Sequence, residues 1–76
     1  MVKILIENNS DIEKCIEIIK CPTHDCSYEL GDGKYDKLDI PAWDSITIES
    51  ACQEICWRYC AGNGTFKKSN TRVIQV

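Results

Sequence analysis

Apolar and polar residues follow one another in short blocks, and the first two blocks predict a strand and a helix. Residues 2–6 are mostly apolar and β-branched, which is typical of a central strand. After the polar run at residues 8–10, Ser10 and Glu13 have the spacing of a capping box, so we expect a helix over residues 10–20. The buried stripe of this helix would contain the apolar residues at helical spacing: Ile12, Cys15, Ile16 and Ile19.

The middle of the chain has the alternation of a hairpin. Apolar and polar residues alternate over residues 26–30, and the Gly-Asp-Gly sequence at residues 31–33 forms a turn after them. Beyond the turn, Asp36, Leu38 and Ile40 would share one face of a second strand over residues 36–40. Pro41 ends the second of these strands. Residues 44–48 fit two interpretations, because they alternate like a strand but also resemble the start of a helix.

The C-terminal part predicts a second helix and a last strand. The helix begins near Ile48 and reaches Cys60, and Gly62 is suited to cap its C-terminus. Residues 71–76 then form the closing strand, and an extra hairpin around residues 65–68 is an alternative. The apolar stripe of the second helix contains Ile48, Ala51, Cys52, Ile55 and Tyr59.

This order of elements, β-α-β-β-α-β, predicts a single α+β domain over residues 1–76. With right-handed crossovers it builds the two-layer split β-α-β sandwich of ferredoxin-like proteins, with two helices on one face of an antiparallel sheet. A different α+β arrangement with the extra hairpin is the alternative. The architecture hosts many unrelated functions, so it implies none of them.

Length and charge narrow the classes of function. A chain of 76 residues forms one hydrophobic core, and it contains no apolar run of about 18 residues that could span a membrane. Its first residues do not have the pattern of a signal peptide, so we expect a cytoplasmic protein. The net charge is −3 and the longest basic stretch is Lys67-Lys68, which argues against nucleic-acid binding.

Six cysteines are unusual in so short a chain. In a secreted protein they would indicate a disulfide framework, but without a signal peptide we expect reduced thiols, metal ligands or buried apolar side chains. Placed on the predicted helices, Cys15 and Cys52 belong to the core. An isolated disulfide from Cys21 to Cys26 or Cys60 is an alternative.

Cys21, His24 and Cys26 lie close together in the sequence, and Cys60 would end the second helix at the same end of the domain. Together they would supply the four ligands of a structural zinc site, although their spacing matches no standard zinc knuckle. The competing interpretation is a solvated loop. A thiol-dependent enzyme is a further alternative, because His24 lies near Cys26, but the chain has no C-x-x-C motif.

Three side chains are candidates for contact with a partner protein. On the predicted second helix, Trp57 points away from the apolar stripe and Arg58 lies beside it, and both types are frequent at binding hot spots. Tyr35 would face the open side of the sheet. Trp43 is expected to close the end of the core. A string of acidic residues forms either a solvated face or a surface for a basic partner: Asp32, Asp36, Asp39 and Asp44.

The sequence therefore predicts a small acidic module that binds another protein by occupying its surface, with no cofactor and no catalytic site. Isoleucine and lysine greatly outnumber leucine and arginine, which suggests an AT-rich source such as a phage or mobile element and an inhibitor of a host factor. A homodimer through the strand edges at Leu38 or Val73 is also compatible with the pattern. The zinc-stabilised domain and the thiol enzyme remain the alternatives.

Overall fold

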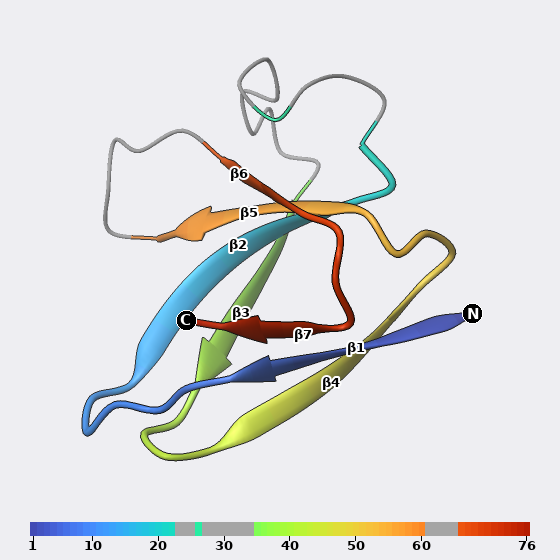
Figure 1. Cartoon of the computed structure of the whole chain (residues 1–76). Helices are drawn as coiled ribbons and strands as arrows, with labels where there is room; N and C mark the ends of the chain where they lie inside the picture. The colour runs from blue at the N-terminus through green and yellow to red at the C-terminus, as the bar shows by residue number, and fades with distance from the viewer. Residues whose placement is uncertain (23–25, 27–34, 61–65) are drawn as a thin grey trace.

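A computed structural model of the chain describes residues 1–22, 26, 35–60 and 66–76 (Figure 1). In these ranges the chain forms seven strands in two sheets, and it contains no helix. The three-stranded sheet has the order β4-β1-β7, in which β1 is antiparallel to β4 and parallel to β7. Its strands are β1 (Val2–Glu7), β4 (Ser45–Ser50) and β7 (Val73–Gln75).

The four-stranded sheet has the order β3-β2-β5-β6 and is antiparallel throughout. Its strands are β2 (Lys14–Lys20), β3 (Asp36–Ile40), β5 (Ile55–Tyr59) and β6 (Lys67–Ser69). The chain passes between the sheets after β1, β3, β4 and β6, so the two sheets are joined at both ends (Figure 1).

The main core lies between the two sheets and consists mostly of isoleucine. Alternate residues of each strand point inward, as the pleat requires. The β-branched side chains suit this environment, and each fully buried isoleucine contributes about 2 kcal/mol from removal of apolar surface from water. The buried members of this cluster are Ile4, Ile6, Ile16, Ile18, Ile40, Ile55, Trp57 and Ile74.

A second, smaller cluster covers the outer face of the four-stranded sheet. Cys26, Cys56 and Phe66 are buried there, and Ile19 packs against them. Both faces of β2 and β5 are therefore at least partly covered. In so small a chain, the three disulfides compensate for the limited apolar core.

The predicted helix over residues 10–20 is wrong, because residues 14–20 form strand β2. Ile16 and Ile18 point into the main core, whereas Glu17 and Ile19 lie on the outer face. A run with apolar side chains on both faces fits the period of a helix as well as that of a strand. Over seven residues, periodicity alone does not distinguish the two.

The predicted second helix is also wrong. Residues 45–50 belong to β4 and residues 55–59 to β5, so the strand interpretation of residues 44–48 is the correct one. The domain is all-β, and both the ferredoxin-like order and the broader α+β class are overturned. The alternative of an extra hairpin around residues 65–68 is met only by the strand β6 in the described part of this region, and β6 belongs to an all-β architecture.

Other predicted elements agree with the structure. The strand at residues 2–6 is confirmed by β1, and the strand at residues 36–40 by β3, with Pro41 directly after it. The closing strand is present as the shorter β7. The predicted strand at residues 26–30 and the turn at residues 31–33 lie outside the described residues, apart from Cys26.

Candidate functional site

Trp43 lies in the turn between β3 and β4 and is 70% exposed. The backbone N–H of Asp44 donates to the carbonyl of Pro41 over 3.2 Å, which closes a β-turn with Trp43 at its third position. The φ angle of Trp43 is 59°, in the left-handed region that favours glycine. A large aromatic side chain therefore projects into solvent from a backbone conformation that disfavours it.

Asn8 joins this turn to the neighbouring loop between β1 and β2. Its side chain is buried, and Nδ2 donates to the carbonyl oxygens of Ile12 at 2.8 Å, Ile40 at 3.0 Å and Pro41 at 3.2 Å. Ile12 lies in the β1–β2 loop, whereas Ile40 ends β3 and Pro41 begins the β3–β4 loop, far away in the sequence. One buried amide therefore holds the two loops side by side.

Further hydrogen bonds complete the connection. The Oδ1 atom of Asn8 accepts from the N–H of Ser10 at 3.0 Å and from its hydroxyl at 2.6 Å. The carbonyl of Ser10 accepts from the N–H of Trp43 at 3.1 Å, and the carbonyl of Asp44 accepts from the N–H of Asn8 at 2.9 Å. We call residues 8–13 and 41–44 together the loop tip.

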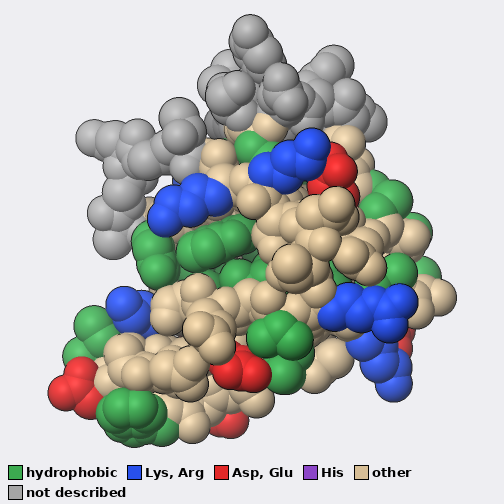
Figure 2. Space-filling model, in the orientation of Figure 1, with side chains coloured by type: hydrophobic (Ala, Val, Ile, Leu, Met, Phe, Trp, Pro, Cys, Tyr) green, Lys and Arg blue, Asp and Glu red, His purple; other side chains and the backbone are tan. Residues whose placement is uncertain are grey.

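The loop tip presents two apolar side chains to solvent. Ile12 is 58% exposed and Trp43 is 70% exposed, and they are among the most exposed large hydrophobic residues of the described chain. Exposed carboxylates accompany them at Asp11, Glu13 and Asp44. Figure 2 shows hydrophobic atoms protruding at the lower left, over the β3–β4 loop, near acidic side chains. Such a surface is suited to contact with another protein.

The sequence predicted that Trp57 is exposed and Trp43 belongs to the core, whereas the structure shows the opposite. Trp57 is 7% exposed and belongs to the main core, so its expected outward position is wrong. On a strand it shares the inward face of Ile55 and Tyr59, whereas a helical wheel placed it opposite the core. Trp43 is exposed rather than part of the core. The Pro-Ala-Trp-Asp sequence between two strands was the available signal, since Pro and Asp favour turns.

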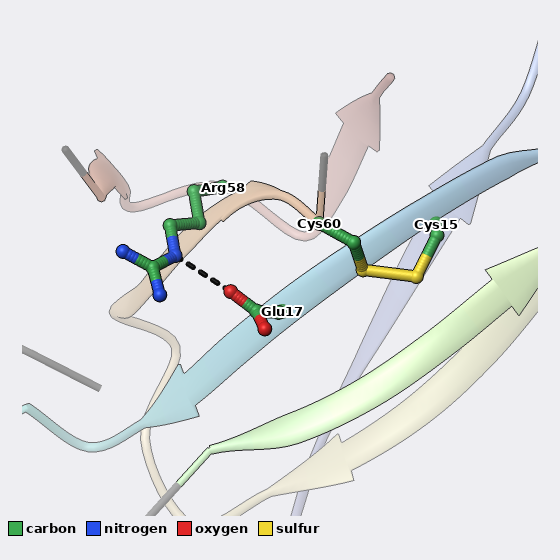
Figure 3. The surroundings of a disulfide bond; sticks show 4 residues. All are labelled: Cys15, Glu17, Arg58 and Cys60. Carbon is green, nitrogen blue, oxygen red and sulfur yellow. Dashed lines mark hydrogen bonds and ion pairs between the residues drawn. A yellow bond between two sulfur atoms is a disulfide. The ribbon is translucent and has the colours of Figure 1, made fainter. Parts of the chain in front are cut away.

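Arg58 and Tyr35 are the other two predicted contact residues. Arg58 lies on the outer face of β5, where its Nε donates to Oε1 of Glu17 over 2.6 Å (Figure 3). Its guanidinium also lies 4.3 Å from the centroid of the Phe66 ring. Tyr35 directly precedes β3 and is half-buried. The ion pair and the aromatic contact therefore involve Arg58 in packing within the sheet. Neither Arg58 nor Tyr35 belongs to the loop tip.

All six cysteines are paired in disulfides: Cys15–Cys60, Cys21–Cys52 and Cys26–Cys56. Cys15 of β2 lies opposite Cys60, which directly follows β5, and their sulfur atoms are bonded (Figure 3). The N–H of Cys60 donates to the carbonyl of Cys15 over 3.0 Å. The alternative pairing of Cys21 with Cys26 or Cys60 is wrong, because Cys21 is bonded to Cys52. Cys15 and Cys52 are not buried core residues but half-buried and exposed disulfide partners.

These bonds occupy the cysteines proposed for zinc and for thiol chemistry. Cys21, Cys26 and Cys60 belong to three different disulfides, and His24 lies outside the described residues. Within the part of the chain that the structure describes, no group of three or more His, Cys, Asp or Glu side chains is placed to hold a metal ion. A disulfide sulfur is not a thiolate, so while the bonds persist these cysteines supply neither ligand nor nucleophile.

The predicted acidic string does not form one continuous unpaired surface. Asp36 lies 3.7 Å from the ammonium of Lys20, whereas Asp39 is exposed in β3 and Asp44 belongs to the loop tip. Asp32 lies outside the described residues. The two strand edges named for a homodimer are real edges, since Leu38 lies in β3 and Val73 in β7, each at the border of its sheet. The homodimer stays a prediction.

In the described ranges there is no helix of the length and apolar character needed to cross a membrane. Comparison of the chain with family models, with curated proteins and with solved structures found no match.

Proposed function

We propose that this protein is a small disulfide-stabilised binding module that acts by occupying a surface of another protein, and that the loop tip makes the contact. Trp43 and Ile12 would enter an apolar depression of the partner. Tryptophan is the side chain most often found at binding hot spots, because it contributes a large rigid surface at low entropic cost.

The observation that carries the proposal is the backbone conformation of Trp43. A left-handed conformation costs a non-glycine residue about 1–2 kcal/mol, and glycine would avoid this cost. The side chain, being 70% exposed, recovers little of that cost within the chain. A strained residue that the surrounding hydrogen bonds hold in place supports a role outside folding.

The hydrogen bonds that hold the loop tip together also support its role in binding. Asn8 is 1% exposed and joins both loops, so Trp43 and Ile12 are presented by a rigid base. A rigid contact surface loses little conformational entropy on binding. The three disulfides favour an oxidising, extracellular-type compartment over the cytoplasm, since thiols are kept reduced in the cytosol.

The test is selection of binding peptides from a random displayed library on the intact protein, with counter-selection on Trp43→Ala. We expect peptides that bind the wild type and lose at least about tenfold in affinity for Trp43→Ala, because removing a hot-spot tryptophan costs about 2 kcal/mol or more. Val73→Ala is the matched control, since Val73 is a 48% exposed hydrophobic residue of β7, outside the tip.

Two results would contradict the proposal. One is a set of selected peptides whose affinity is the same for the wild type and Trp43→Ala. The other is an equal loss with Val73→Ala, which would indicate general adhesion to apolar surface. Sedimentation equilibrium of both variants separates this role from the homodimer, because a dimer through the β7 edge would respond to Val73→Ala instead.

A further inference from the structure

The loop tip accounts for the net charge of the chain. Its residues, 8–13 and 41–44, include three carboxylates, those of Asp11, Glu13 and Asp44, and no lysine or arginine. The whole chain has twelve acidic and nine basic side chains, so nine of each lie outside the tip. The net charge of −3 is therefore concentrated where the exposed apolar side chains lie.

No ion pair among the described residues includes a carboxylate of the tip. The ion pairs there use the other acidic side chains Glu17, Asp36 and Glu54. Lys14 directly follows the tip in the sequence, but its ammonium lies 5.4 Å from the centroid of the Tyr59 ring, in a cation–π contact. All three carboxylates of the tip belong to exposed residues. Their charge is therefore available to a partner.

The backbone places these charges around the two exposed apolar side chains. Asp11 and Glu13 flank Ile12 in the sequence, and Asp44 directly follows Trp43. The hydrogen bonds of the tip hold its two loops side by side. Figure 2 shows acidic side chains next to the hydrophobic atoms that protrude at the lower left. Charges attract over about 8 Å at physiological salt, so the carboxylates need not point at one atom to favour a cationic surface.

We propose that the partner of the loop tip is a protein whose apolar depression is bordered by lysine or arginine side chains. This inference rests on the function proposed for the tip and specifies the chemistry of its partner. Trp43 and Ile12 would fill the depression, and the carboxylates would face the cations at its rim. Complementary charges at a rim mainly raise the rate of association, whereas a buried aromatic side chain mainly slows dissociation.

The same charges argue against the other surfaces to which an exposed tryptophan is suited. Tryptophan and aliphatic side chains are also typical of attachment to a membrane interface. Three carboxylates without partner cations would, however, be repelled by anionic lipid headgroups and by the phosphates of nucleic acids. A basic protein surface is the partner for which both the apolar and the charged side chains of the tip are favourable.

The experiment uses three displayed peptide libraries that share the same random apolar positions. The flanking positions are lysine or arginine in the first library, aspartate or glutamate in the second, and serine or asparagine in the third. Each library is selected on the intact, oxidised protein, with counter-selection on Trp43→Ala. We expect Trp43-dependent peptides mainly from the basic library. Their association rate constant should fall at least about fivefold between about 50 mM and about 500 mM sodium chloride.

Neutral variants test the charges directly. Asp11→Asn, Glu13→Gln and Asp44→Asn keep the shape of the side chain, and Asp44→Asn also keeps the acceptor for the N–H of Ser45. Each should slow association about two- to fivefold and leave the dissociation rate nearly unchanged. Glu49→Gln is the matched control, because Glu49 is an exposed carboxylate of β4. It lies about 16 Å along the strand from Asp44, beyond the range of screened charges.

The inference is overturned if Trp43-dependent peptides come equally from the acidic or the neutral library, if the three tip variants associate as fast as the wild type, or if Glu49→Gln slows association as much as they do. In these cases peptides still bind through Trp43, so the function proposed for the tip stands. A lack of Trp43-dependent peptides from all three libraries would overturn both. Vesicles of phosphatidylcholine with phosphatidylserine are the last probe, and Trp43-dependent binding to them would indicate a membrane instead of a basic protein.

Discussion

Glu17 of β2 and Arg58 of β5 lie directly opposite each other and form an ion pair with an Nε–Oε1 distance of 2.6 Å on the outer face of the sheet. The carboxylate is nearly buried, with 10% of the side chain exposed, and the guanidinium is 24% exposed. The Cys15–Cys60 bond is two residues away along both strands, and the Phe66 ring stacks on Arg58. The pair is therefore shielded on both sides.

This shielding predicts that loss of one partner destabilises the fold. Glu17→Ala leaves the Arg58 guanidinium partly buried without its counter-charge, and we expect the free energy of unfolding to fall by about 2 kcal/mol. Urea unfolding of the oxidised protein measures this change. Lys20→Ala is the control, since its pair with Asp36 is largely exposed and should contribute less than about 1 kcal/mol. Equal effects of the two substitutions would contradict the argument.

Asn8 should be among the least replaceable polar residues of the chain. Asn8→Ala removes the donors to the carbonyls of Ile12, Ile40 and Pro41 and leaves buried polar groups without partners, so we expect a loss of about 3 kcal/mol. Hydrogen exchange should accelerate at Trp43 and Asp44, whose amides donate within the loop tip. Unchanged exchange at these two amides would show that Asn8 does not hold the loops together.

The backbone at Trp43 predicts an unusual order of stability among its variants. At a positive φ, glycine avoids the steric cost that alanine retains, so Trp43→Gly should be more stable than Trp43→Ala by about 1 kcal/mol. Neither variant should bind peptides selected through Trp43. Thermal and urea unfolding of the two variants give the comparison. At an ordinary negative φ the alanine variant would be the more stable, and that order would refute the assigned conformation.

The three disulfides should be reduced in a definite order. Cys52 is exposed, and Cys21 and Cys52 border a pocket of about 280 Å³, whereas Cys26 and Cys56 are 6% and 0% exposed. We expect graded reduction, followed by alkylation and peptide mass analysis, to open Cys21–Cys52 first and Cys26–Cys56 last. Early alkylation of Cys56 would contradict this order.

Removal of one bond tests its contribution to stability. When the Cys21–Cys52 bond is removed, the Cys26–Cys56 bond remains. Cys21 and Cys52 lie five and four positions from its two ends, so Cys21–Cys52 closes an additional loop of about ten residues. Closing a loop of this length stabilises a fold by about 2–3 kcal/mol in the chain-entropy model. The double variant Cys21→Ala with Cys52→Ala should lose stability of this order, as measured by urea unfolding. A loss below about 1 kcal/mol would contradict the chain-entropy argument for this bond.

The strands that the sequence predicts correctly share one property. Residues 2–6 and 36–40 are short β-branched or alternating runs with turn-forming residues next to them, and no helical stripe competes. Residues 14–20 and 55–59 are different, because both faces of these strands carry buried or half-buried side chains. Burial on both faces removes the simple alternation, and the remaining pattern matches a helix equally well.

The candidate site was missed for the same reason. Side-chain direction depends on the period of the backbone, so a helical interpretation of residues 48–60 turned Trp57 outward. The sandwich predicted with this helix placed Trp43 at the end of the core. The wrong secondary structure also separated cysteines that are paired across strands. Cys15 and Cys60 are 45 residues apart in the chain, and only the pairing of β2 with β5 brings them together.

By itself, the sequence determined the limited length available for a core, the unusual number of cysteines, and the strands at residues 2–6 and 36–40. Those properties follow from length, composition and local alternation. The tertiary structure alone decided that the domain is all-β, which cysteines are bonded and which tryptophan is exposed. The physical reason is that a strand obtains its hydrogen bonds, and a cysteine its partner, from residues distant in the sequence, whereas the periodicity of a short segment records only how its own side chains alternate.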